Sequence, residues 1–227
     1  MCDAYYLDLM SFTLEKFKIL LLSEEMIPSR RILLEDTDEC FNILHEMGVY
    51  SLQDLISTLG CKQKRENFSH RSGLSLNYLT ILWREAKSYH PKVVYFREIP
   101  GLKDADIDVL ARIGITHSRH LFRRAQTENQ RAQLSDITGI PTARLLEMVR
   151  LSDLARVRGL GPAFVRLFYE IGVDSIVSLA RSDPGQLFKK AHALNQTGKF
   201  TKVIPPLKDF EQYIRMAQDL PKEIEYP

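Results

Sequence analysis

The stretch "RVRGLGPAF", residues 156–164, holds the residues whose spacing most suggests chemistry. Gly159 and Gly161 flank a single leucine, and such close glycines let a backbone approach another group. Pro162 suits the first position of a helix, where its missing N–H would have no partner anyway. The approaching group is either a phosphate, bound by backbone N–H groups at the helix N-terminus, or another helix.

Arginines surround this hairpin, and Arg156, Arg158 and Arg166 would add positive charge at its rim. Residues 110–170 hold ten basic and five acidic side chains, and all ten bases are arginine. Arginine favours planar contacts with phosphate or carboxylate. The alternative is that these arginines pair with acids inside the protein, since residues 1–54 carry a net charge of −7 and the whole chain only +2.

Other residue types give no catalytic or metal signature. No GxxxxGK[ST], GxSxG or HExxH motif occurs, so we expect no enzyme and no cofactor. The three cysteines lack zinc-site spacing and are expected to be idle thiols: Cys2, Cys40 and Cys61. His117 and His120 could form half a metal site, but no third ligand is placed beside them, so solvated histidines are expected.

Three further stretches each have an ordinary structural interpretation. The acids "EDTDE" at 35–39 suit a solvated helix N-terminus, although they could also suggest a metal site. Trp83 is expected in the core rather than as a platform for base stacking. The basic run "KQKREN" at 62–67 is expected to be a solvated loop.

An internal repeat organises the chain. Gly48, Gly114 and Gly172 each stand between a helix end and a new helix and fit the left-handed position after a helix, in the segments "LHEMGVYSLQDL", "LARIGITHSRHL" and "FYEIGVDSIVSL". A second set of similar segments follows at 72–86, 138–152 and 204–218. It aligns Trp83 with Val149 and Ile214.

Helical periodicity is found throughout, which predicts an all-α fold of tandem helix-hairpin-helix-like repeats with short helices joined by Gly and Pro turns. We expect Thr13 to cap a helix over 12–24. The predicted organisation is an N-terminal helical extension at 1–34, a degenerate repeat at 35–97, a second repeat at 98–157 and a third at 158–227.

The third repeat, through "RGLGPAFVRLF" and "EIGVDSIVSLA", resembles the helix-hairpin-helix motif, whose backbone N–H groups contact phosphate without reading sequence. The second repeat keeps Gly101 but has Lys103 where the second glycine is expected, followed by three acids. The first repeat has Glu35 and Thr37 in place of the glycines, so its role is expected to be structural.

The motifs "TGIPTARLLEMVRLSDLARVRGLGPAFVRLFYEIGVDSIVSLA" and "VIPPLKDFEQYIRMAQDL" are similar to a family of bacterial proteins known as domain of unknown function 4332. The resemblance covers residues 100–220 and extends to "MIPSRRILLEDTDECFNILHEMGV". It implies a helix-hairpin-helix fold and no established activity.

Two functions remain open. One is weak, sequence-independent nucleic-acid binding, DNA more than RNA, through residues Arg156, Arg158, Gly159, Leu160, Gly161, Arg166, Gly101 and Lys103. The other is a protein-interaction scaffold in which the glycines only allow close helix packing. Without a secretory signal or a long apolar run, the expected location is cytoplasmic, with no membrane or small-molecule partner.

Overall fold

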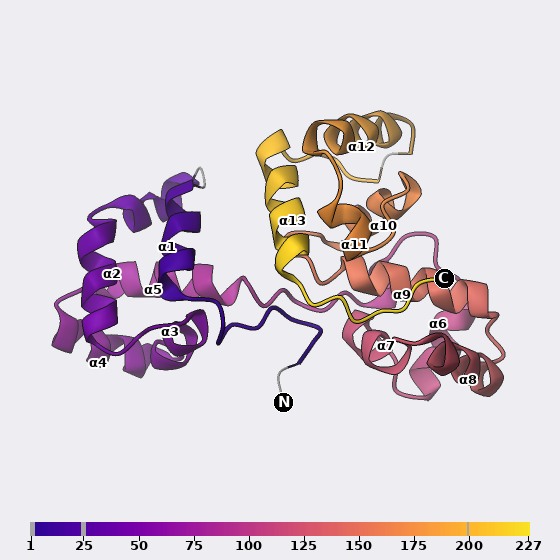
Figure 1. Cartoon of the computed structure of the whole chain (residues 1–227), viewed down its shortest axis with the longest axis horizontal. Coiled ribbons are helices and arrows are strands. Elements are labelled where there is room, and N and C mark those ends of the chain that lie inside the picture. Colours follow the sequence, from indigo (N-terminus) through magenta and orange to yellow (C-terminus); the bar gives the residue numbers. More distant parts are fainter. Residues whose placement is uncertain (1–2, 24–25, 199) are drawn as a thin grey trace. The chain divides into compact units, whose positions relative to one another are not determined.

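A computed structural model describes residues 3–23, 26–198 and 200–227, and Cys2 lies outside these ranges. The predicted all-α class is confirmed, because the described residues form helices and only isolated β-bridges (Figure 1). No helix among them is long and apolar enough to cross a membrane. The chain forms two compact units. The first unit is Asp8–His90, and the second unit comprises Asp3–Leu7 and Pro91–Pro227.

The first unit is built from α1 (Leu14–Ser23), the 3-10 helix η1 (Pro28–Leu34), α2 (Thr37–Glu46), α3 (Leu52–Thr58), α4 (Lys62–Ser72) and α5 (Leu76–Lys87). Thr13 caps α1 as predicted, because its side chain accepts the Lys16 N–H at 3.1 Å. The basic run at 62–67 is not a loop. It forms the first half of α4, whose polar sequence is held to the unit by the buried Phe68.

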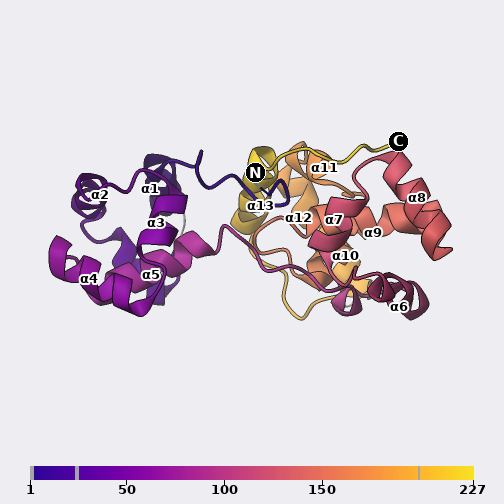
Figure 2. The same ribbon diagram turned by 90° about the horizontal axis from the view of Figure 1, so that it is seen from below.

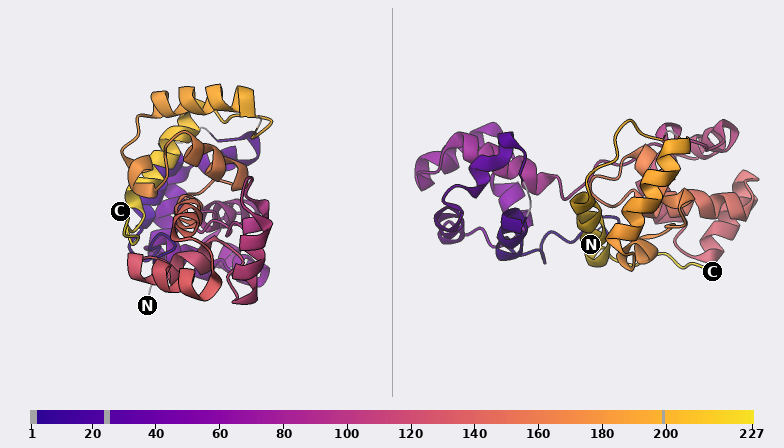
Figure 3. Two further views of the ribbon diagram at one scale, coloured as in Figure 1. Left: turned by 90° about the vertical axis from the view of Figure 1, so that its right-hand side faces the viewer. Right: turned by 90° about the horizontal axis from the view of Figure 1, so that it is seen from above.

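The second unit contains the 3-10 helix η2 (Phe96–Glu98), α6 (Asp104–Arg112), α7 (Ser118–Arg124), α8 (Glu128–Thr138), α9 (Thr142–Leu154), α10 (Pro162–Glu170), α11 (Ile176–Ala180), α12 (Pro184–Gly198) and α13 (Leu207–Asp219). The central helix α9 packs against α7, α8 and α10 (Figure 2). The C-terminal helix α13 packs against α11 and α12 (Figure 3).

The three predicted turn glycines adopt the left-handed conformation. Their φ angles are 84° at Gly48, 79° at Gly114 and 85° at Gly172. After each glycine, the next residue donates its N–H to a carbonyl of the preceding helix, at 2.9 to 3.0 Å. This local geometry satisfies the last carbonyls of α2, α6 and α10. The tandem repeat and its boundaries at 35, 98 and 158 stay a prediction.

The aligned core positions differ between the three segments. Leu79, Leu145 and Phe210 are all fully buried. Val149 is also buried, but its counterpart Trp83 is only half-buried, so the core expectation for this tryptophan is wrong. The cations of Arg65 and Lys87 lie 4.7 Å and 4.9 Å from the centroid of the Trp83 ring and hold it at the surface of the first unit.

Candidate functional site

The hairpin at 154–173 connects α9 to α10 through a tight turn. Gly159 has a φ of 89°, which is the left-handed region. The Leu160 N–H donates to the Val157 carbonyl, and the Gly161 N–H donates to the Gly159 carbonyl, both at 3.2 Å. Leu160 is buried and anchors the turn in the core. These two N–H groups are therefore used within the hairpin.

The two glycines of the hairpin meet different surroundings. A Cβ atom on Gly159 would lie 2.9 Å from Cε1 of Tyr213, so this glycine allows α13 to pack closely against the turn. Gly161 has a φ of −76°, and no atom lies within 4 Å of a Cβ built there. Gly159 is therefore needed for the close packing of another helix, whereas Gly161 borders open space.

Open space at Gly161 leads to the N-terminus of α10. No side chain caps this helix, and its first turn contains no acidic residue. Pro162 has no N–H, so the first helical donors are those of Ala163 and Phe164, which have no acceptor within the helix. The intrahelical bonds begin with Val165, which donates to the Gly161 carbonyl at 2.9 Å. These first-turn donors and the helix dipole favour an anion here.

A groove of about 690 Å³ runs beside this helix end, within the second unit. One wall is the hairpin from Val157 to Pro162, and the other is the extended segment 91–95. Lys92 supplies a cation to the groove, and the ring of Tyr95, whose exposed fraction is 50%, supplies an aromatic surface. Glu98 is the acidic residue of the lining. The sequence raised Tyr95 as an aromatic residue that could stack on bases but left it out of the predicted site, and it missed Lys92, although Pro91 signalled the extended segment that carries both.

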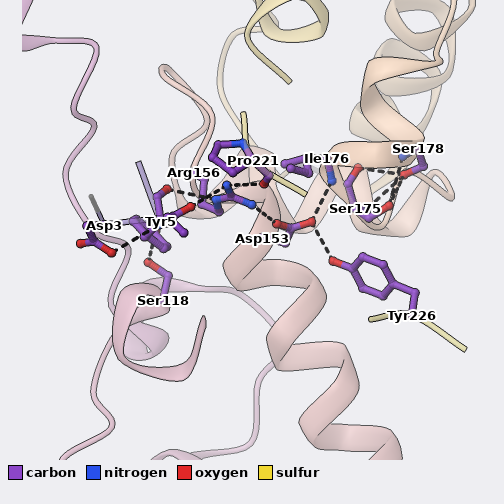
Figure 4. A network of polar contacts seen from close by, with 11 residues as sticks. Asp3, Tyr5, Ser118, Asp153, Arg156, Ser175, Ile176, Ser178, Pro221 and Tyr226 are labelled. Carbon is purple, nitrogen blue, oxygen red and sulfur yellow. Dashed lines mark hydrogen bonds and ion pairs between the residues drawn. The ribbon is translucent and has the colours of Figure 1, made fainter. Parts of the chain in front are cut away.

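Arg156 does not belong to this site, which corrects the sequence prediction. Its side chain is 0% exposed and pairs with the buried carboxylate of Asp153 at 2.6 Å (Figure 4). The same guanidinium donates to the carbonyls of Tyr5, Ala4 and Pro221 at 2.7 to 3.0 Å. The guanidinium is therefore fully engaged within the protein, where it links Asp153 of α9 to segments near both ends of the chain.

Asp153 completes this buried network from the other side (Figure 4). Its second carboxylate oxygen accepts the Ile176 N–H at 3.0 Å and the Tyr226 hydroxyl at 2.7 Å. Burial raises the pKa of Tyr226, and the negative charge of Asp153 raises it further. The phenol therefore stays protonated and remains a donor.

Arg166 and Gly101 come together, but as a packing contact. The guanidinium carbon of Arg166 lies 3.3 Å from the place of a Cβ on Gly101, whose φ is 82°. Arg166 also pairs with Glu147 and Glu170. Burial acts to lower the pKa of Arg166, but the two carboxylates outweigh it and raise the pKa. The positive charge of Arg166 is thus balanced by carboxylates of the protein itself, as the alternative interpretation of the arginines expected.

The two remaining predicted residues are Arg158 and Lys103. Arg158 is half-buried, and its backbone N–H donates to Sδ of Met216 on α13 at 3.1 Å. Lys103 is exposed and directly precedes α6, whose first turn carries Asp104 and Asp106. Neither residue lines the groove. The structure thus brings together Gly159, Leu160 and Gly161 of the predicted residues and adds Lys92 and Tyr95 to them.

His117 and His120 form a helix cap rather than half of a metal site. The Nδ1 atom of His117 accepts the His120 N–H at 3.3 Å, and the two rings stack with centroids 3.6 Å apart. In the described part of the chain, no three His, Cys, Asp or Glu residues lie close enough to hold a metal ion. The aligned residues Ser51 and Ser175 cap α3 and α11. The alignment of the three turn segments was the sequence signal that could have predicted a helix cap at His117.

Comparison with known proteins gives one match. The family model described as "Domain of unknown function (DUF4332)" matches residues 100–220, most of the second unit. No curated protein and no solved structure matches the chain. The match spans more than half of the 227 residues. The chain therefore belongs to the DUF4332 family, a family of unknown function.

Proposed function

We propose that this protein is a non-enzymatic binding protein whose hairpin at 154–173 weakly contacts a nucleic-acid backbone without reading its sequence. The observation that carries the proposal is the uncapped N-terminus of α10, which opens beside Gly161 into the groove. A phosphate oxygen there would accept the N–H groups of Ala163 and Phe164. Lys92 would contribute charge from the opposite wall.

The expected affinity is low, because the protein itself uses the charges of Arg156 and Arg166. One or two neutralised phosphates predict a shallow salt dependence, with binding about 3-fold to 12-fold weaker when NaCl rises from about 50 mM to about 200 mM. Backbone contacts of this kind position a nucleic acid and leave base identity unread. DNA is the expected ligand.

Fluorescence anisotropy of labelled duplex and single-stranded DNA tests the proposal. The variant Gly161→Asp places a carboxylate at the N-cap of α10, where it accepts the open N–H groups and repels phosphate. We expect this variant to remain folded and to lose at least tenfold in affinity. Gln133→Glu is the matched control, because it makes the same charge change on an exposed face of α8 outside the groove.

The absence of binding even at low salt would refute this proposal, as would equal binding by Gly161→Asp and the parent protein. An equal loss of DNA affinity in Gly161→Asp and Gln133→Glu would show that only the net charge of the protein matters. That result would also contradict a site at the hairpin. Replacing Lys92 with glutamine should weaken binding by a smaller factor than Gly161→Asp, since it removes one exposed charge.

The second candidate is a protein-interaction scaffold in which the hairpin glycines are purely structural. The contact between Gly159 and the Tyr213 ring favours it, as does the pairing of Arg166 with Glu147 and Glu170. This candidate predicts that the parent protein leaves both DNA probes unbound and recovers a stable protein partner in a pull-down.

A further inference from the structure

Two cations and one indole ring come together in the first unit, where α4 packs against α5. The guanidinium carbon of Arg65 on α4 lies 4.7 Å from the centroid of the Trp83 ring, and the ammonium nitrogen of Lys87 on α5 lies 4.9 Å from it. We call these three residues the Trp83 cluster. It is separate from the hairpin and its groove, which belong to the second unit.

No carboxylate of the described chain forms an ion pair with the Trp83 cluster. Residues 62–87, which include α4 and α5, hold six basic and only two acidic side chains. Both acids are paired with other cations, Glu66 with Lys62 at 3.6 Å and the buried Glu85 with Arg30. Two cations held at one ring without a counter-ion repel each other, so the cluster favours an anionic partner.

Two donors of the cluster independently indicate a missing acceptor. The Nε–H of Arg65 and the indole N–H of Trp83 are buried, and neither has a hydrogen-bond partner in the described chain. Buried polar groups are nearly always paired, so two unpaired donors within one contact call for an explanation. The nitrogens of a guanidinium and an indole only donate. The missing partner is therefore an acceptor, and beside two cations an anionic oxygen fits best.

The beginning of α4 adds positive charge next to the cluster. Three of its first four residues are basic, namely Lys62, Lys64 and Arg65, and its first turn contains no acid. Cations are unfavourable at this end of a helix, where the dipole is already positive. Lys64 and Arg65 donate to the carbonyls of Ser57 and Leu59 at 2.9 Å and 2.7 Å. These bonds fix the position of the two cations without neutralising them, so a field that attracts anions remains.

The surface of α4 fits a nucleic-acid backbone better than a folded protein. Its one apolar side chain, Phe68, is only 4% exposed. Protein interfaces depend on apolar or aromatic anchors, and the exposed side chains of α4 offer none. Bases and small polar groups are instead typical of surfaces that contact phosphates. Exposed bases continue along the two helices at Lys62, Lys64, Arg71 and Arg84.

We propose that the Trp83 cluster binds a phosphate of a nucleic-acid backbone, as a contact additional to the hairpin. The phosphate oxygens accept the Nε–H of Arg65 and the indole N–H of Trp83. The exposed Lys87 carries its ammonium over the ring on a flexible stem, so it moves toward the phosphate and opens the way to these donors. The proposal rests on the proposed function for the choice of DNA as ligand, but every residue involved belongs to the first unit.

The chain contains a single tryptophan, so the indole signal reports on this cluster alone. The test titrates the full-length ¹⁵N-labelled protein with a short DNA duplex at low salt and follows the indole N–H resonance of Trp83 by NMR. We expect a saturable downfield shift of the indole proton, because it gains a hydrogen bond to phosphate. The variant Gly161→Asp, which blocks the hairpin, should still show this shift at saturation.

Matched variants in the Gly161→Asp background separate a site from general attraction. Backbone amide signals of α4 and α5 give the affinity in each case. Lys87→Gln should weaken DNA binding about twofold to fivefold, the effect of one exposed ion pair. Lys190→Gln, the same change at an exposed position of α12, should leave the affinity unchanged. Trp83→Phe should also weaken binding, although it changes no charge, because it removes a donor that has no partner in the described chain.

An indole signal that stays in place throughout the DNA titration would overturn the proposal, as would equal effects of Lys87→Gln and Lys190→Gln. Full affinity in Trp83→Phe would also overturn it, since positive charge alone would then account for binding. Two further probes, an oligoglutamate peptide and vesicles containing phosphatidylserine, should cause no saturable shift. A saturable shift with either probe would assign the cluster to an acidic protein or to a membrane instead.

The two proposals fail in different ways. An indole shift that persists in Gly161→Asp supports the Trp83 cluster even if the hairpin binds no DNA. Loss of binding in Gly161→Asp, with an indole signal that never moves in the parent protein, would leave the hairpin as the contact and exclude the cluster.

Discussion

Gly159 and Gly161 stand two residues apart in one hairpin, but a methyl group added at each position should have very different consequences. Gly159 has a φ of 89°, and a Cβ there would lie 2.9 Å from Cε1 of Tyr213. Gly161 has a φ of −76° and free space around its Cβ position. The pair Gly159→Ala and Gly161→Ala therefore compares a strained, crowded site with a relaxed, open one within the same turn.

The expected loss of unfolding free energy can be estimated for each variant. At Gly159, the left-handed conformation costs an alanine about 1–2 kcal/mol. Crowding against the Tyr213 ring adds about 1–3 kcal/mol. Alanine also lowers the conformational entropy of the unfolded chain, which stabilises the folded protein by about 0.4–1 kcal/mol. The net loss is about 1–4.5 kcal/mol. At Gly161, the same entropy gain roughly offsets the poorer N-cap preference of alanine, so the change stays within about 0.5 kcal/mol of zero.

Native-state amide hydrogen exchange is the suitable assay, because the chain has two compact units that can unfold separately. Protection of amides in α10 and α13 reports the unfolding free energy of the second unit alone. We expect Gly159→Ala to lower that free energy and to leave the first unit unchanged. Gly161→Ala should leave both units unchanged.

The origin of the loss can be checked with a third substitution. Tyr213→Leu removes the ring atom that a Cβ at Gly159 would meet. In the Tyr213→Leu background, Gly159→Ala should cost about 1–3 kcal/mol less than in the parent protein, because the crowding is removed and only the left-handed strain remains. Strict additivity of the two substitutions would refute the crowding argument. Equal losses in the two alanine variants would refute the whole distinction between the glycines.

Two more predictions concern His117 and Arg156. Burial and the neighbouring His120 lower the pKa of His117, so the unfolded chain takes up a proton near pH 6.5 that the folded protein resists. The free energy of unfolding should therefore fall as the pH drops below about 6.5, and His117→Ser, which keeps a capping side chain, should lessen this fall. Arg156→Met should lower the free energy of unfolding by about 3–5 kcal/mol, since it leaves Asp153 charged and buried without its partner.

Native-state amide hydrogen exchange in the second unit, at about pH 7.5 and about pH 5.5, measures both effects. An identical pH dependence in His117→Ser and the parent protein would contradict the lowered pKa of His117. A loss below about 1 kcal/mol in Arg156→Met would contradict the assigned role of the buried pair.

Features that depend on a few neighbouring residues were predictable from the sequence. The all-α class follows from helical periodicity, and the left-handed conformation of Gly48, Gly114 and Gly172 follows from their place after a helix. Thr13 caps α1 for the same kind of local reason. The interpretation failed at 62–67, where a basic run was expected to be a loop. The apolar residue that holds this run in a helix, Phe68, comes after it in the sequence.

The candidate site needed the tertiary structure, because its character depends on contacts between residues far apart in the sequence. An arginine beside a glycine turn predicts a contact with phosphate. Arg156 is instead buried, and its guanidinium donates to the carbonyls of Tyr5 and Pro221. The packing of α13 places the Tyr213 ring against Gly159, and this contact could be found only in the tertiary structure. The sequence by itself determined the helices and the shape of their turns, since hydrogen bonds within a turn span three to five residues. Which charges and N–H groups remain open to a ligand was decided by long-range packing, which local residue patterns do not encode.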